Sequence, residues 1–316
     1  MKRLERLFLT MLVAVLVSCN SNDDAVEAGI EIPGITITDD ADCCSAEEAL
    51  QVYNFLQTVK IVPELQTVVD GQYNVFVYTP TGDFHQGYND VYFVATKRSS
   101  GNYVKDFNVN IITPLMTMTK MGMQHSTPVG SSIESFNDGY LAVKHGWVSL
   151  LMPTSENGTW QISYSATVLG KQGGVTNADI AVAALPDGQE WIKSFKNGDD
   201  TYFLSLVNPG SWKTGTNAIR AYVSKKSSDV KSPYKLAAET FTIDIDPRMP
   251  DMDNHTSPDN VALKRRDDGS YEGLVNLTMT GRWRIHLTVR DAKGNIVAGG
   301  DTLDDGFSSL YWDVTI

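Results

Sequence analysis

The sequence is poor in cysteine, in positive charge and in long apolar runs, and each shortage excludes a class of protein. Only three cysteines occur among 316 residues, and the neighbours Cys43 and Cys44 do not suit the usual geometry of a disulfide. They could be free thiols, a vicinal disulfide or a pair of soft-metal ligands, but they are not a disulfide framework. The formal net charge of −12 argues against nucleic-acid binding, which needs a basic face.

The longest apolar run lies at the N-terminus and has the layout of a secretory signal. Basic residues precede an almost wholly apolar stretch, residues 7–18, which is too short for a spanning helix. The stretch leads into LVSC, residues 16–19, which resembles a bacterial lipobox; the alternative is a plain signal peptide with a chance cysteine. The resemblance implies removal of residues 1–18 and diacylglycerol on Cys19. We therefore expect a lipid anchor in the outer membrane of a Gram-negative cell envelope, on its periplasmic or surface face.

The sequence also lacks the short motifs of common catalytic, nucleotide and calcium sites. There is no G-x-S-x-G, no H-E-x-x-H, no P-loop and no G-x-G-x-x-G after a strand. A D-x-D-x-D-G calcium loop is missing as well. No serine, histidine and acid form a recognisable arrangement. We predict that the chain is not an enzyme.

What the chain does contain is a long series of β-branched and aromatic runs bounded by glycine, asparagine and proline. The run at 282–290 alternates cleanly, with Trp283 on an apolar face and His286 on a polar one. Short strands at such spacing favour an all-β architecture of immunoglobulin-like sandwiches over parallel α/β units. Before them, residues 19–44 are predicted to be a flexible tether, and a capping-box pattern predicts a short helix or linker at 45–59.

An internal repeat organises the rest of the chain. Residues 87–128 match residues 215–258, and each stretch passes from strands into a methionine-rich loop that ends in proline. The repeat defines two units, at 60–187 and 190–316. Each is long enough for a two-sheet sandwich with its own core, so we predict two tandem β-sandwich domains.

The repeat places methionine and histidine in a loop at the same position of each unit. The candidate metal ligands are Met116, Met121, Met123 and His125 in the first loop, and Met249, Met252 and His255 in the second. Thioether sulfur is soft and uncharged and prefers Cu(I), whereas imidazole accepts Cu(I), Cu(II) or Zn(II). Asp246, Asp251 and Asp253 add negative potential near the second loop. The alternative is packing, because methionine fills irregular gaps and Met116 and Met118 alternate as strand residues do.

The second copy resembles the YtkA-like (FixH-like) family in three successive segments. These are MPDMDNH at 249–255, GSYEG at 269–273 and MTGRWRI at 279–285. The resemblance spans roughly residues 215–300, and a degenerate copy spans roughly 87–168, with Gly-Thr-Trp at 158–160. The family implies an immunoglobulin-like module of secreted or membrane-attached bacterial proteins with a link to copper handling. The first loop departs from the pattern, since it is about three residues longer and has no Met-Pro pair.

These observations predict copper binding, with Cu(I) favoured, for copper delivery, buffering or resistance. Ligand exchange with a copper-handling protein partner would move the ion. One alternative is a surface interaction or adhesion module whose methionine loops are apolar contact patches without metal. Another is carbohydrate binding through an exposed aromatic residue such as Trp212. His85, His145 and His286 are expected to lie outside the metal sites, with His85 in a solvated turn.

Overall fold

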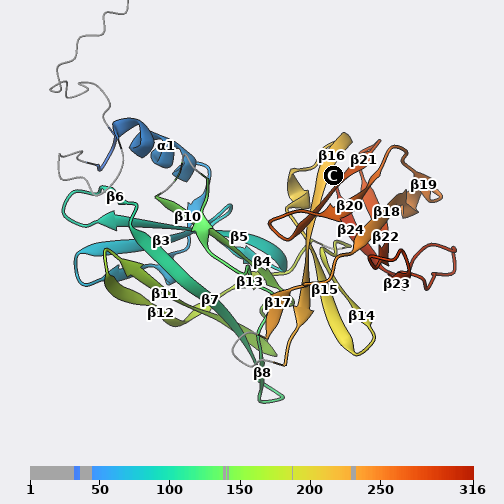
Figure 1. Ribbon diagram of the computed structural model, residues 1–316, viewed down its shortest axis with the longest axis horizontal. Helices are drawn as coiled ribbons and strands as arrows, with labels where there is room; N and C mark the ends of the chain where they lie inside the picture. Colours follow the sequence, from blue (N-terminus) through green and yellow to red (C-terminus); the bar gives the residue numbers. More distant parts are fainter. Residues whose placement is uncertain (1–31, 36–44, 138–139, 141, 187, 229–232) are drawn as a thin grey trace, which may run out of the picture.

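The computed structural model describes residues 32–35, 45–137, 140, 142–186, 188–228 and 233–316. Cys19, Cys43 and Cys44, the predicted signal peptide and most of the predicted tether lie outside these residues. The described chain forms two β-rich bodies side by side (Figure 1). Of the described residues, none belongs to a helix long and apolar enough to cross a lipid bilayer.

The first body is a sandwich of two antiparallel sheets. One sheet has the order β1 (Lys60–Ile61), β3 (Tyr73–Thr79), β5 (Gly87–Lys97), β10 (Val143–Leu150) and β9 (Glu134–Ser135), with β2 (Thr67–Val69) on β3 and β6 (Tyr103–Val104) on β5. The other has the order β12 (Lys171–Ile180), β11 (Gly158–Val168), β7 (Phe107–Met118) and β8 (Met123–His125). β4 (Phe84–His85) and β13 (Val182–Ala183) form a parallel pair. Alternating side chains of both sheets meet in one buried core that includes Phe93, Phe107 and Trp160.

Helix α1 (Ala46–Leu56) packs on the outer face of the first sheet, above β5 and β10 (Figure 1). Ser45 caps it: its Oγ accepts from the Glu48 backbone N–H, and the Glu48 side chain accepts from the Ser45 N–H. This is the capping box expected from the sequence. Ala49 and Val52, on the side of the helix that faces the sheet, are buried against it. A face of the sheet that would otherwise meet water thus becomes part of a second small core.

The second body consists of a single continuous sheet folded around its own core. The order is β14 (Ile192–Asn197), β15 (Asp200–Leu206), β16 (Gly215–Lys226), β21 (Ser270–Leu277), β20 (Val261–Arg265), β18 (Thr242–Met249), β22 (Arg282–Arg290) and β23 (Ile296–Ala298). β17 (Tyr234–Leu236) pairs with β16, β19 (His255–Thr256) with β18, and β24 (Tyr311–Thr315) with β22. Two short 3-10 turns lie in this body, η2 (Pro209–Ser211) and η3 (Pro250–Met252), and a third, η1 (Pro63–Leu65), lies in the first body. Trp283 and Trp312 are wholly buried in this core.

The strand pairing repeats between the two bodies. β3, β5 and β10 follow one another in the first sheet as β15, β16 and β21 do in the second body, and β7–β11 pairs as β18–β22 does. β8 pairs antiparallel with the end of β7, just as β19 pairs with the end of β18. The methionine-rich loops therefore occupy topologically equivalent places.

An aromatic stack and a buried carboxylate join the two bodies. Tyr222 of the second body stacks on Trp147 and Tyr88 of the first, with ring centroids 4.5 and 5.9 Å away. Asp90 accepts a hydrogen bond from Asn208 at 2.6 Å, across the interface. Burial by itself would raise the pKa of Asp90, but its hydrogen bonds outweigh burial and lower that pKa. A charged acceptor holds such bonds more strongly than a neutral one, so the two bodies are fastened together.

Candidate functional site

Both methionine-rich loops fold as tight β-hairpins at the ends of equivalent strands. In the first, β7 turns back into β8, and Met116 lies opposite His125. In the second, β18 turns back through η3 into β19, and Met249 lies opposite His255. Residues directly opposite in an antiparallel pair project from the same face, with Cβ atoms about 4.5–5.5 Å apart. Each hairpin therefore sets a thioether beside an imidazole.

The first hairpin carries a second pair of facing residues on that same face, and both are methionines. Met118 lies opposite Met123, two residues along from the first pair. Because side chains alternate along a strand, Met116 and Met118 share a face, and so do Met123 and His125. Three sulfur atoms and one imidazole thus project from one side of a single hairpin. The alternation of Met116 and Met118, which fits a packing role, also places their two sulfur atoms on one face with His125.

A glycine of β11 leaves room beneath these sulfur atoms. Gly158 lies opposite Met118 in the register of β7 and β11. A Cβ atom placed on Gly158 would collide with Cε of Met116 and would lie 3.2 Å from Sδ of Met118 and 3.4 Å from Sδ of Met116. Both sulfur atoms therefore converge on one point above the glycine. Only a residue without a side chain permits this approach.

A buried tryptophan lies next to the histidine of each hairpin. The Trp160 indole N–H donates to the Met152 carbonyl at 2.9 Å, and its ring centroid is 5.7 Å from that of His125. Trp283 repeats this arrangement, with its N–H donating to the Met279 carbonyl at 2.9 Å. Both indoles are wholly buried. A buried tryptophan thus lies beneath the methionine–histidine pair of each hairpin. We call Trp160 and Trp283 the tryptophan floor of their hairpins.

The second hairpin is sparser. Met249 is 3% exposed, and a Cβ on Gly281 would meet only its Cε, at 3.0 Å. His255 is exposed, with its ring centroid 6.5 Å from that of Trp283. Met252 lies in η3 at the hairpin tip and is 49% exposed. Only one thioether is therefore held close to the imidazole.

The structure divides the seven predicted ligands into anchored and exposed residues. Met116 and Met249 are buried at the hairpin roots, while Met121, Met123 and Met252 are exposed. Met121 lies in the turn between β7 and β8, outside the paired residues. Met118 is not among the seven predicted ligands, yet it lies on the same face as Met116, as its spacing of two residues along the strand implies.

Acidic side chains lie near the second hairpin but form no ligand cluster among the described residues. Asp246, which was expected to add negative potential, forms a salt bridge with Arg248 at 2.8 Å. Asp251 and Asp253 lie at the tip of the second hairpin, with Asp253 in a left-handed conformation. Within the described ranges, no group of three or more histidine, cysteine, aspartate and glutamate residues could hold a metal ion. The donor set of the hairpins is soft rather than hard.

The other histidines have structural partners. His145 lies 2.8 Å from Asp90 through Nε2. His85 lies edge-on to Trp191 at the interface rather than in a purely solvated turn. His286 was expected on a polar outer face, but it is only 3% exposed and donates from Nδ1 to the Ser308 carbonyl at 2.6 Å. The loop before β24 covers it, and burial lowers its pKa.

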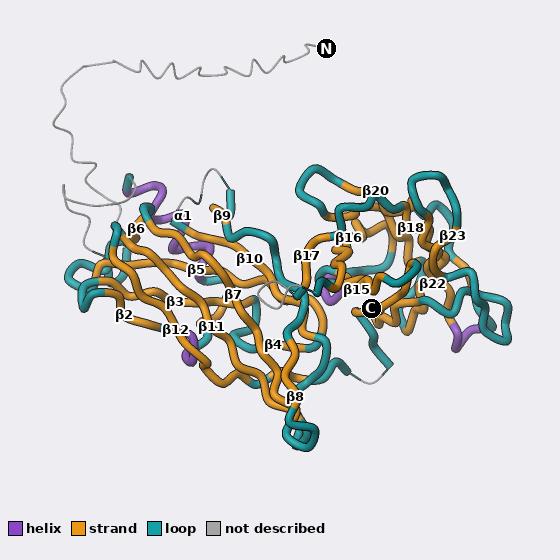
Figure 2. The backbone as a smooth tube through the Cα atoms, turned by 60° about the horizontal axis from the view of Figure 1, so that its bottom comes forward, coloured by secondary structure: helices purple, strands orange, loops and turns teal. Residues whose placement is uncertain are grey.

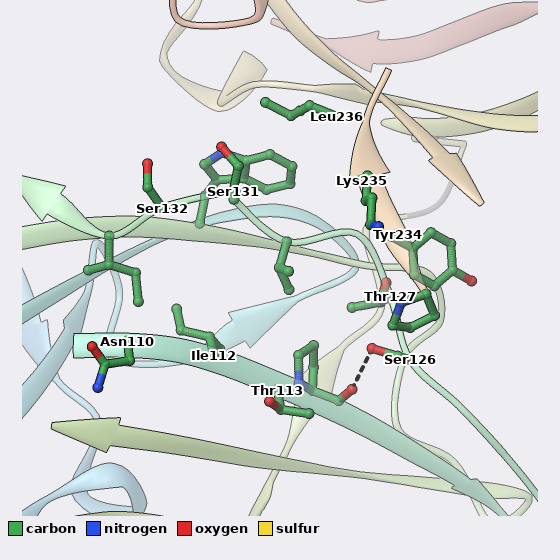
Figure 3. Close-up of a pocket in the computed structure, with 16 residues that line it drawn as sticks. Asn110, Ile112, Thr113, Ser126, Thr127, Ser131, Ser132, Tyr234, Lys235 and Leu236 are labelled. Carbon is green, nitrogen blue, oxygen red and sulfur yellow. Dashed lines mark hydrogen bonds between the residues drawn. The ribbon is translucent and has the colours of Figure 1, made fainter. Parts of the chain in front are cut away.

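A cavity of about 480 Å³ opens beside the first hairpin, between the two bodies (Figure 3). Ile112 and Thr113 of β7 line one side, Ser131 and Ser132 the other, and Tyr234 of β17 closes it. At its edge, Ser126 donates a hydrogen bond to the Pro114 carbonyl at 2.8 Å. The two methionine hairpins lie far apart: β8 projects at the bottom of the molecule (Figures 1 and 2), and β19 lies on the second body (Figure 1). They cannot share one ion.

Three solved structures show distant similarity to this chain. The Yersinia pseudotuberculosis adhesin InvE is 12% identical with a TM-score of 0.20, covering 73% of this chain and 55% of that one. The structure named pT26-6p is 9% identical with a TM-score of 0.22, covering 81% and 67%. SGBP-B of the Bacteroides ovatus mixed-linkage glucan utilization locus, in complex with a mixed-linkage heptasaccharide, is 13% identical with a TM-score of 0.15, covering 72% and 40%. The chain thus spans just over half the length of the adhesin.

Comparison with family models is more specific. No curated protein matches the chain. One family, described as YtkA-like, matches residues 196–288, from the end of β14 almost to the end of β22. The match includes the second hairpin and does not extend to the first body, so it does not confirm the degenerate copy predicted at 87–168. Residues 196–288, which lie in the second body, are therefore similar to the YtkA-like family.

Proposed function

We propose that this protein is a lipid-anchored, extracytoplasmic β protein that binds Cu(I) at its methionine–histidine hairpins and passes the ion to a partner. The β fold and the YtkA-like domain at 196–288 are compatible with such a module. The lipid anchor on Cys19 and the location in the cell envelope rest on the sequence. Copper binding is the part of the proposal that the hairpin geometry supports.

The observation that carries the proposal is the repeated opposition of methionine and histidine. Met116 faces His125 and Met249 faces His255 in two hairpins that differ in length and in sequence. A packing role needs the buried methionine but not an imidazole directly across from it. Thioether and neutral imidazole together suit Cu(I), and the thioether binds it without losing a proton.

Ligand exchange is the mechanism that this arrangement supports. The buried methionines keep their packed positions while the ion is transferred. Met123 and Met252 are exposed and can meet the ligands of a partner first. The copper ion would keep its oxidation state and change only its ligands, so no electron or proton acceptor is needed. An exposed thioether gives way to an incoming ligand at little cost to the fold, because it has few contacts to lose.

Anaerobic competition for Cu(I) against a coloured chelator tests the proposal. The wild-type chain is compared with a variant in which the sulfur and imidazole donors of both hairpins are replaced, methionine by leucine and histidine by alanine. Leucine conserves the volume of methionine, so the fold is expected to survive. We expect the wild type to withdraw Cu(I) from the chelator and the variant to leave it there. Equal withdrawal by both proteins would contradict the proposal.

The exposed methionines favour a second candidate, a surface contact module. Met121, Met123 and Met252 are about half exposed or more, which is unusual for large apolar side chains. The replacement of methionine by leucine separates the two functions, because leucine keeps the apolar contact and removes the sulfur. A contact module would bind its partner unchanged after that replacement, whereas copper binding would be lost.

A further inference from the structure

We infer that the two hairpins are unequal and that the first, outside the YtkA-like match, is the tighter and more selective Cu(I) site, with Met118 as one of its ligands. This inference rests on the proposed function, since it assigns affinities to sites that the proposal introduces. It places the principal copper site in the body that the family model does not match.

The difference begins with the number of paired residues in each hairpin. β7 and β8 pair at Met116–His125 and again at Met118–Met123, with one pair between them. β18 and β19 stop after Met249–His255, where η3 begins. Since every second pair returns to the same face, the longer hairpin presents two rows of donors and the shorter one presents a single row.

The glycines beneath the hairpins show the same difference at atomic distance. Above Gly158, the sulfur atoms of Met118 and Met116 lie 3.2 and 3.4 Å from one point. Above Gly281, the single atom within 4 Å is Cε of Met249, and no sulfur is that close. Two thioethers are thus already brought together in the first hairpin before any ion binds, which lowers the entropy lost on binding.

The charges at the hairpin tips differ in sign. Lys120 lies in the turn of the first hairpin, whereas Asp251 and Asp253 lie in the turn of the second. Carboxylate oxygen suits harder divalent ions, and a nearby ammonium disfavours them more than it disfavours a singly charged ion. The first hairpin should therefore discriminate Cu(I) from divalent ions more strongly than the second. A tight site paired with a weaker one suits a protein that retains one ion and releases another.

The test is an anaerobic Cu(I) titration of the full purified chain against chelators of graded affinity. We expect two binding steps in the wild type. Met118→Leu should weaken the tighter step by about tenfold or more, which corresponds to losing one ligand of ordinary strength. Met121→Leu is the matched control, because Met121 lies on the same hairpin but outside its paired face. Met249→Leu should affect the weaker step alone, because Met249 is the thioether paired with His255 in the second hairpin.

A rescue variant guards against a folding artefact. Met118→His replaces one Cu(I) donor by another and should keep the tighter step, although it changes the side chain more than leucine does. Circular dichroism and thermal unfolding are recorded for each variant alongside the titration. Retention of the tight step in Met118→Leu, or equal losses in Met118→Leu and Met121→Leu, would overturn the inference while leaving copper binding in place. Failure of the wild type to bind Cu(I) at all would overturn the proposed function itself.

Discussion

The two methionine hairpins hold equivalent positions in one strand order, yet they present different numbers of donors. Both have a buried methionine opposite a histidine and next to a wholly buried tryptophan. The first continues for one more pair on the same face, whereas the second ends in a 3-10 turn. Because the side-chain period of a strand is two residues, a few residues of loop length decide whether a second row of ligands exists. The two hairpins thus share the buried tryptophan beneath them and differ in the residues above it.

The bodies also differ in how their sheets close. In the second body, β20 pairs with both β18 and β21 and joins the two halves of the sheet. Its counterpart β9 in the first body has two residues and pairs with β10 alone. The segment before β9 runs past Ile133 without joining β7, and the cavity beside the first hairpin lies there. Incomplete closure of the first sandwich therefore leaves a cavity beside the first hairpin.

The largest loss of stability is expected from replacing the buried tryptophan that each hairpin has beneath it. Trp160→Ala and Trp283→Ala should each destabilise the protein by about 3–5 kcal/mol, since each deletes a wholly buried side chain and leaves a cavity. Urea unfolding followed by circular dichroism measures both losses. Similar values would show that the hairpins differ only above the floor. A small loss for one variant would break the equivalence of the two bodies.

The glycines should give smaller losses that arise from different causes. Gly158→Ala is expected to cost about 1–3 kcal/mol by overpacking against Met116. Gly281→Ala is expected to cost a similar ~1–3 kcal/mol, mainly because its φ of +127° strains a residue with a side chain.

Double variants separate these two causes. Shortening of Met116 to valine should relieve much of the Gly158→Ala loss, since it removes the colliding atom. Shortening of Met249 to valine should leave the Gly281→Ala loss nearly unchanged, because backbone strain remains. Free energies of unfolding of the single and double variants give the coupling in each body. Equal coupling energies in the two bodies would contradict the assignment of overpacking to Gly158→Ala and of backbone strain to Gly281→Ala.

The smallest effect concerns pH and the second body. Burial lowers the pKa of His286, although the Ser308 carbonyl, Asp305 and Asp246 oppose this and Arg284 adds to it. Above the ordinary histidine pKa of about 6.5, both folded and unfolded chains hold a neutral imidazole. As pH falls below that value, the unfolded chain gains a proton before the folded one does, so stability decreases. His286→Phe should make the loss of stability between about pH 7 and 5 shallower. An unchanged slope would show that His286 does not contribute to it.

The tandem β architecture could be predicted because its signals are local. Alternating runs and turn residues each depend on neighbouring residues, and the strand at 282–290 appears as β22. His286 shows the limit of this reasoning. Alternation placed it correctly on the face opposite Trp283, but Phe307 and Ser308 cover that face, and they come from a loop far along the chain. Exposure depends on what packs over a strand, which a local pattern does not contain.

The candidate site divides in the same way. From the sequence alone came the inventory of soft donors, their position after equivalent strands and their repetition in two units. Only the tertiary structure decided that Met118 joins the donor face, that Met121 leaves it, and that Gly158 lets two sulfur atoms converge while Gly281 faces one methyl group. The physical reason is that ligand identity is a property of single residues, whereas convergence is a property of register between strands. Turn length and neighbouring strands set that register.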